Sequence, residues 1–278
     1  YDSDDGVVEK TIPIEAPPSH STSSTLPVEY CGITMRQVHA VLANMERRCV
    51  AEGWKDRDGS LLTPENVNLY HLNEYIIKPF TIEHKTSFVE ALPSTAGPQL
   101  PRWFVSHWWG DPVRDSTACL DRVVIDFKNN FDDDEDDRGG GMSDDTPFWV
   151  CAYANNQWEL GKDITKDPKE SGFTRAMLVA NNRTITILDK EGIVFSRVWC
   201  VFELNLTLVD SKKENAEGKS KGGEWGIYTA HTHTYNHPRR GEEERQAVGI
   251  ISGGSTLDYG ESDRIAAREA AFPYSLIK

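Results

Sequence analysis

Short apolar runs alternate with longer amphipathic segments along the second half of this 278-residue chain. Four runs are rich in β-branched and aromatic residues and are short enough for buried strands. They occupy residues 103–106, 148–153, 184–188 and 225–230. Helical spacing of apolar residues predicts helices at 116–129, 172–180, 197–209, 242–251 and 262–271. This alternation predicts an α/β fold, in which helices flank a parallel sheet of about five strands with right-handed connections.

The residues before 99 follow a different pattern. Residues 1–28 are rich in Pro, Ser and Thr and hold few large apolar side chains, so we predict an extended or disordered segment. Apolar residues recur at helical spacing over 34–52, and a second helix is predicted over 64–79, which begins with a proline. We therefore expect a helical extension at 29–98, followed by the α/β domain at 99–278.

The connection between these two helices resembles the later part of a calcium-binding EF-hand loop. Asp56, Asp58 and Glu65 fall at its third, fifth and twelfth positions, and Gly59 falls at its sixth. Trp54 stands at the first position, where the loop needs a carboxylate. Two interpretations stay open, a plain helix–turn–helix connection and a weak calcium site.

The segment 185–208 carries the clearest chemical signal. Its apolar strand ends at Asp189, and buried parallel strands deliver functional groups at their carboxyl ends. Apolar residues occupy nearly every face of the helix that follows, so Glu203 is expected among neighbours that exclude water. Such a carboxylate is either paired with a cation or used in chemistry. The candidate structural partners are Arg175, Arg183 and Arg197.

Three segments within roughly residues 100–275 resemble the Toll/interleukin-1 receptor (TIR) domain family. They are PRWFVSHWWGDP at 101–112, FWVCAYANNQWELGKDI at 148–164 and SRVWCVFEL at 196–204. The first two fit many flavodoxin-like sheets, whereas the third is similar to the Ser-x-Trp-Cys-x-x-Glu-Leu signature of the catalytic branch. The resemblance implies a flavodoxin-like sheet and a glutamate, here Glu203, that cleaves the nicotinamide glycosidic bond of NAD.

The resemblance also implies which side chains surround the ligand. Loops after parallel strands meet at one edge of the sheet, where ligands bind. The expected binding residues are Ser106, His107, Trp108, Trp109, Asp111, Asn155, Asn156, Gln157 and Trp199. Trp108 or Trp109 would stack on nicotinamide or adenine, or one of them would lie in the core. The amides at 155–157 stand where the family usually has an acid, and would either bind a ribose or carboxamide or fix the following loop.

Three functional hypotheses follow from these residues. The first is a TIR-like, NAD-consuming glycohydrolase or NAD-derived signalling domain, with NAD as a substrate and no cofactor assigned. The second is a non-catalytic TIR-like interaction module that associates with itself or with other TIR-like domains. The third is an enzyme like the nucleoside deoxyribosyltransferases, which needs a second carboxylate beside Glu203. Asp111 is the candidate for that second carboxylate.

Charge and composition restrict the partners. The formal net charge of −14 disfavours nucleic acids and anionic membranes, because both are polyanions. No apolar run reaches 18 residues, so no membrane span is predicted. The acidic, Gly-rich stretch at 132–145 is expected to be a solvated loop or a patch for cations or partners. His231, His233 and His237 alternate without a neighbouring Cys or carboxylate, and no metal site is assigned to them.

The cysteines point to a reducing environment. They are odd in number, widely spaced and mostly placed in apolar patterns, which predicts unpaired thiols and favours the cytoplasm or another reducing compartment. They are Cys31, Cys49, Cys119, Cys151 and Cys200. Because the sequence begins at Tyr1 without a methionine, we expect a processed or excerpted chain, and the removal of a targeting peptide stays open.

Overall fold

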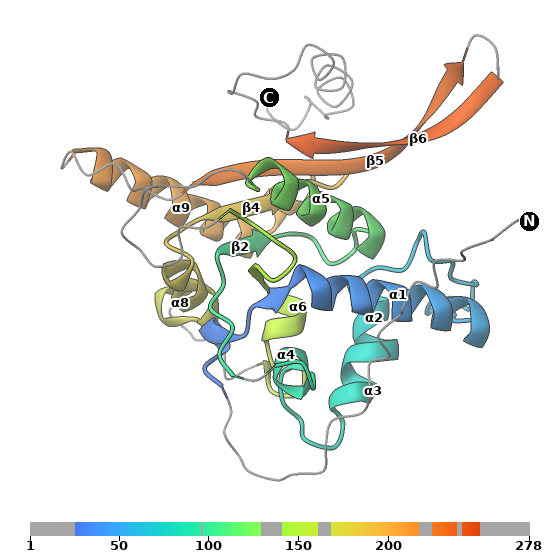
Figure 1. Cartoon of the computed structure of the whole chain (residues 1–278), viewed down its shortest axis with the longest axis horizontal. Helices are drawn as coiled ribbons and strands as arrows, with labels where there is room; N and C mark the ends of the chain where they lie inside the picture. Colours follow the sequence, from blue (N-terminus) through green and yellow to red (C-terminus); the bar gives the residue numbers. More distant parts are fainter. Residues whose placement is uncertain are drawn as a thin grey trace, which may run out of the picture.

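A mixed six-stranded sheet has the strand order β1-β3-β2-β4-β5-β6. Figure 1 labels β2, β4, β5 and β6 of this sheet. The structure is a computed structural model that describes residues 26–95, 97–128, 141–160, 168–216, 224–237 and 241–250. The strands are β1 (Ile33–Thr34), β2 (Trp103–Ser106), β3 (Pro147–Val150), β4 (Thr184–Ile187), β5 (Trp225–His237) and β6 (Gly241–Ile250). Helices flank this sheet, so the predicted α/β class is confirmed.

The four central strands β3, β2, β4 and β5 run parallel to one another. In this register Phe104 lies opposite Trp149 on one side and Thr184 on the other. The two edge strands, β1 and β6, pair antiparallel with β3 and β5. The prediction of a parallel sheet is therefore right for the centre and wrong for both edges. A strand of two residues such as β1 is too short to show a period of its own.

The segment at 242–251, which the sequence predicts as a helix, forms strand β6 instead. It pairs antiparallel with β5, which continues seven residues beyond its predicted end at 230, with Tyr228 opposite Ile250 and His237 opposite Gly241. Its Glu, Arg and Gln residues favour helix, but cross-strand pairing with a long neighbour overrides that weak preference. The helix predicted at 262–271 lies outside the described residues.

Eight α-helices of the described residues surround the sheet, and most coincide with predicted segments. They are α1 (Met35–Glu52), α2 (Leu69–Leu72), α3 (Lys78–Thr81), α4 (Phe88–Ala91), α5 (Val113–Asp126), α6 (Cys151–Ala154), α8 (Gly172–Val179) and α9 (Val198–Ala216). Short turns of other helix types are η1 (Val28–Tyr30), η2 (Asn73–Ile77, a π-helix), η3 (Pro168–Glu170) and η4 (Ile193–Ser196). The second predicted strand, at 148–153, is shorter than expected, because α6 begins directly after β3.

Capping residues set where the two predicted N-terminal helices begin. Thr34 accepts a hydrogen bond from the Gln37 amide and the Gln37 side chain accepts one from the Thr34 amide, so α1 begins as predicted. The helix predicted from residue 64 begins only at Leu69, because Asn68 forms the same reciprocal cap with His71. The helix that follows is broken into α2, η2 and α3.

The EF-hand-like connection directs its carboxylates to separate partners. Asp56 lies 3.2 Å from the imidazole of His71, and Glu65 accepts a hydrogen bond from Arg114 at 2.7 Å. Asp58 accepts from a backbone amide of its own turn at 2.9 Å. Within the described part of the chain, no group of three or more His, Cys, Asp or Glu side chains is placed to hold a metal ion. The geometry here is that of a helix–turn–helix connection.

Side chains of β2 alternate between the two faces of the sheet. Trp103 packs against Phe127, at the end of α5, with ring centroids 5.0 Å apart. Phe104 points to the other face and stacks on Trp149 at 5.0 Å. Ser106 lies two residues after Phe104 and therefore shares its face, at the carboxyl end of the strand. Helices α8 and α9 pack on that face, whereas α5 packs on the opposite one.

The helical extension and the sheet share one hydrophobic core. Met35 and Val41 of α1 and Phe88 of α4 are fully buried in the same cluster as Phe104 and Phe148 of the sheet. In Figure 1, α1 lies below α5, and α2, α3 and α4 lie on the side of the molecule opposite the β5–β6 hairpin. The described residues from 26 to 95 are thus part of the packing that supports the sheet.

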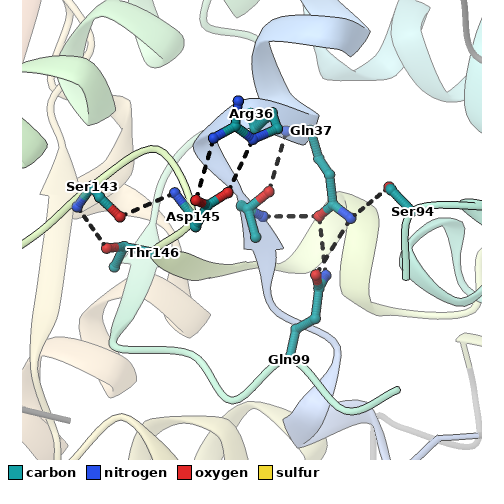
Figure 2. A network of polar contacts seen from close by, with 8 residues as sticks. Arg36, Gln37, Ser94, Gln99, Ser143, Asp145 and Thr146 are labelled. Atoms are coloured by element: carbon teal, nitrogen blue, oxygen red, sulfur yellow. Dashed lines mark hydrogen bonds and ion pairs between the residues drawn. The ribbon is translucent and has the colours of Figure 1, made fainter. Parts of the chain in front are cut away.

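A polar network ties the beginning of α1 to two other segments (Figure 2). Gln37 donates to the Ser94 hydroxyl at 3.0 Å and accepts from the Gln99 amide at 3.0 Å. Arg36 donates to Asp145 through two nitrogens, at 3.0 and 3.2 Å. Because Asp145 lies just before β3, this pair helps to hold β1 at the edge of the sheet.

Three further expectations concern cysteines, membranes and the histidine cluster. All five cysteines lie in the described residues and none forms a disulfide bond, as predicted. Within the described ranges, no helix has the length and apolar composition needed to cross a membrane. The side chains of His231, His233 and His237, and most of the acidic stretch at 132–145, lie outside the description of the structure.

Candidate active site

Three segments meet at the carboxyl ends of β2 and β3. They are the loop that begins at Ser106 and His107, the start of α6 at Cys151, and the first turns of α9 with Cys200 and Glu203. The Cys200 thiol lies 3.8 Å from the His107 carbonyl oxygen, and the Cys151 sulfur lies 4.0 Å from His107 Nε2. The Ser106 hydroxyl lowers the pKa of both Cys200 and Glu203. The structure therefore gathers these five residues, which we call the Glu203 cluster.

Glu203 is the buried acid of this cluster. Its side chain is 3% exposed, and its Oε2 atom has no hydrogen-bond partner among the described residues. Burial raises the pKa of Glu203 to about 8, and the Ser106 hydroxyl and the positive charge of Arg197 offset only part of this effect. The carboxyl group therefore holds a proton at neutral pH in this conformation.

The structural alternative for Glu203, a buried ion pair with an arginine, is not formed among the described residues. The three candidate arginines bind elsewhere: Arg175 pairs with Glu29 at 3.1 Å, Arg183 with Glu224 at 3.7 Å, and Arg197 contacts the Tyr70 hydroxyl at 3.5 Å. An unpaired buried carboxyl is costly to keep, so its presence at a strand end favours a functional role.

Glu203 is expected to make the protein less stable as pH rises. Its pKa is about 8 in the folded state against an ordinary value of 4.5, so between these pH values the folded state holds a proton that the unfolded state lacks. This contribution to stability is complete below pH 4.5 and is lost as pH rises through about 8. When pH rises from about 6 to about 8, the wild-type protein should lose about 2 kcal/mol more unfolding free energy than Glu203→Gln, because Gln does not titrate.

Urea unfolding of both proteins at the two pH values measures this difference. Other buried acids, such as Asp111, titrate equally in both proteins and cancel in the comparison. A difference that stays constant with pH would mean that Glu203 does not titrate in this range.

His107 and the two thiols are neutral members of the cluster. Burial lowers the pKa of His107 to about 4, and because the Val105 carbonyl can only accept, His107 Nδ1 carries the hydrogen of their 3.1 Å bond. Burial raises the pKa of Cys151 to about 12 and that of Cys200 to about 11. Neither thiol is therefore a thiolate nucleophile, which agrees with the prediction that Cys200 belongs to the core.

The two adjacent tryptophans have different environments. Trp109 donates from its indole nitrogen to the Cys151 sulfur at 3.1 Å and packs at a tilt on Tyr70, with centroids 5.4 Å apart. Trp108 is partly exposed, and its ring covers Gly110 so closely that a side chain at that position would clash with it. Trp109 thus joins the packing around the Glu203 cluster, whereas Trp108 covers its own loop.

The amides after β3 mainly fix the backbone that follows. Gln157 donates to the carbonyl oxygens of Ala152 and Asn155 at 3.1 and 3.3 Å, and Asn156 donates to the Lys85 carbonyl. These bonds correspond to the second of the two predicted roles, that of tying down the loop. The oxygen atoms Asn155 Oδ1 and Gln157 Oε1 are buried without a hydrogen-bond partner in the described structure.

Asp111 interacts with residues of its own loop and of the turn after β4. Burial raises the pKa of Asp111 to about 8, repulsion from Asp115 and Asp189 adds to this, and the Ser116 hydroxyl donates to its carboxylate at 3.2 Å. The groups that shift the pKa of Glu203 do not include Asp111. The prediction of a second carboxylate beside Glu203 therefore gains no support from the contacts of Asp111.

Trp199 packs into a line of aromatic rings. It stacks on Phe173 at 5.5 Å with an interplanar angle of 21°. We call this line the aromatic row; its members are Phe104, Trp149, Phe173, Trp199 and Phe202. The row connects β2 and β3 to α8 and α9, so Trp199 positions the helix that carries Glu203.

The carboxylate at the end of β4 is a structural anchor. Asp189 accepts hydrogen bonds from the backbone amides of Glu191, Ile193 and Val194 at 3.1, 2.9 and 3.0 Å. These bonds hold the turn that leads through η4 into α9. The carboxylate that the sequence places at the end of this strand is therefore explained by its hydrogen bonds to the backbone of the turn.

A cleft of about 490 Å³ lies elsewhere on the molecule. Its walls include Glu29, Glu90, Asn156 and Arg175, but no member of the Glu203 cluster. A small cavity of about 20 Å³ among the described residues lies beside His107. The Glu203 side chain itself is shielded from solvent in this conformation.

Two residues of the site region were not predicted as binding residues. Arg197 appears in the sequence only as a candidate ion-pair partner, and Tyr70 belongs to α2 of the extension. Tyr70 lies 127 residues from Arg197 in the chain, so no local pattern connects them. Comparisons of the chain with protein-family models, curated proteins and solved structures found no match.

Proposed function

We propose that this protein is a TIR-like, NAD-consuming glycohydrolase with Glu203 as the reacting carboxylate. The observation that supports this most is the buried, unpaired Glu203 beside Ser106, at the carboxyl ends of parallel strands. Numbered along the chain, the four parallel strands have the order 2-1-3-4, as in flavodoxin-like sheets. In such sheets ligands bind where connections leave a central strand in opposite directions, which here is the end of β2.

The chemistry requires a negative charge beside the ribose. Cleavage of the nicotinamide bond develops positive charge on the ribose, and an ionised Glu203 would stabilise this charge until water adds to the anomeric carbon and releases a proton. Glu203 is protonated in this conformation at neutral pH, because burial raises its pKa to about 8. The positive nicotinamide ring of NAD favours the ionised carboxylate, so substrate entry itself would lower the pKa of Glu203.

A nicotinamide-release assay tests this function. Purified protein is incubated with NAD, and nicotinamide and ADP-ribose products are separated and quantified over time. We expect equimolar release of nicotinamide and an ADP-ribose product. The absence of release at saturating NAD, across a range of protein concentrations, would contradict the proposal.

A non-catalytic interaction module is the second candidate, and the outer face of α9 favours it. Val198, Val201 and Leu208 lie on one side of this helix and are 82%, 46% and 40% exposed. Exposed apolar side chains that share a face are typical of interaction surfaces. Concentration-dependent self-association in sedimentation, together with no NAD turnover, would favour this candidate over the enzyme.

A further inference from the structure

Arg197 lies beside the Glu203 cluster without a carboxylate partner among the described residues. Its side chain is partly exposed, and its hydrogen bond to the Tyr70 hydroxyl is long, at 3.5 Å. Arg197 directly precedes α9, which carries Cys200 and Glu203. The ring of Tyr70 packs on Trp109, whose indole nitrogen donates to the Cys151 sulfur at 3.1 Å, so these contacts place the guanidinium beside the cluster. This position combines access from solvent with proximity to the buried acid.

Arg197 differs from six other arginines of the described structure, which each pair with a carboxylate. Six of them bind a carboxylate within 4.0 Å: Arg36, Arg48, Arg114, Arg122, Arg175 and Arg183. Arg197 instead keeps most of its five N–H donors without a protein acceptor in the described structure. A guanidinium with unused donors, next to a buried acid, is suited to a planar anion such as a phosphate group.

We infer that Arg197 binds a phosphate group of the ligand whose glycosidic bond faces Glu203. This inference rests on the proposed function and deepens it, because it assigns the residue that recognises the phosphate and predicts that affinity for the ligand depends on that phosphate. Arg197 and Glu203 form no ion pair among the described residues, so the guanidinium is not committed to the carboxyl group that would face the glycosidic bond.

Tyr70 positions the Arg197 side chain. Its hydroxyl holds the Arg197 guanidinium, while its ring rests on Trp109, whose carbonyl oxygen accepts from the Leu69 amide at 3.0 Å. The bond to Tyr70 is weak enough to yield to a phosphate, which makes shorter, charge-assisted bonds with a guanidinium. The extension thus supplies the residue that positions Arg197.

The test compares two ligands that differ in phosphate. NAD and nicotinamide riboside carry the same glycosidic bond, but only NAD carries phosphate. For Arg197→Gln we expect the KM for NAD to rise about 10- to 100-fold, as loss of charge-assisted hydrogen bonds implies. Turnover of nicotinamide riboside should change less than about twofold, because that ligand offers Arg197 no anion. Arg197→Lys should fall between wild type and Arg197→Gln, and the exposed Arg57→Gln serves as the matched control.

Calorimetric binding of ADP-ribose separates this inference from the proposed function. We expect Arg197→Gln to weaken ADP-ribose binding and Arg57→Gln to leave it unchanged, with both variants unfolding at the wild-type temperature. Equal binding by wild type and Arg197→Gln, or no binding by wild type, would overturn the inference. Binding that depends on Arg197 without any NAD turnover would support the phosphate site and contradict the glycohydrolase.

Discussion

Replacing Glu203 with Gln is expected to reduce nicotinamide release from NAD about 1,000-fold or more. The amide keeps the shape of the side chain but cannot carry the negative charge that faces the developing positive charge on the ribose. Loss of such an electrostatic group typically costs two to three orders of magnitude in rate, and loss of the reacting carboxylate itself costs at least as much. Initial rates measured at saturating NAD give the comparison directly.

Two controls separate a loss of catalysis from a loss of folding: the stability of Glu203→Gln and the turnover of a matched variant. Because Glu203 forms no ion pair among the described residues, Glu203→Gln should not lose the roughly 3–5 kcal/mol that breaking a buried pair removes. Glu74→Gln makes the same chemical change at an exposed position of η2 and should retain wild-type turnover. Retained turnover in Glu203→Gln would exclude Glu203 as the reacting group.

Replacing Trp149 with Ala is expected to lower the free energy of unfolding by about 3–5 kcal/mol. Trp149 is fully buried, stacks on Phe104 and meets the edge of Phe173 at 5.2 Å. Its indole nitrogen also donates to the Val28 carbonyl at 2.9 Å, so the change removes both packing and a buried hydrogen bond. Urea unfolding of wild type and variant measures the loss.

Trp108→Ala provides the comparison, since it deletes the same side chain at a partly exposed position. We expect it to lose less than half as much stability as Trp149→Ala, because part of the Trp108 ring already contacts water. Equal losses for the two variants would contradict the central role of Trp149 in the core.

The fold could be predicted where local pattern and tertiary packing agree. The run at 103–106 matches β2 residue for residue, because a short β-branched and aromatic run that is buried on both faces has few other solutions. The run at 242–251 was wrongly predicted as a helix, because its pairing with the extended end of β5 depends on a distant partner and leaves no local period. The two residues of β1 were missed for the related reason that so short a strand shows no pattern.

The sequence could predict which loops of the candidate site lie together, because these loops follow the carboxyl ends of neighbouring parallel strands. Ser106, His107 and Glu203 lie near one another, because the end of β2 and the helix after β4 converge at one edge of the sheet. Asp111 and the amides at 155–157 lie in the expected loops, but their bonds to their own neighbours decide where they point. Such short-range bonds could not be read from residue types alone.

Because α2 contacts both Trp109 and Arg197, ligand binding at the Glu203 cluster would be coupled to the docking of the extension. If a ligand takes Arg197 from Tyr70, the extension loses part of the free energy that docks it on the sheet. Thermodynamic linkage makes this coupling reciprocal, so anything that pulls α2 away from the sheet changes ligand affinity by the same factor. A partner that binds the helical extension and moves α2 would then change the affinity of the Glu203 cluster for its ligand.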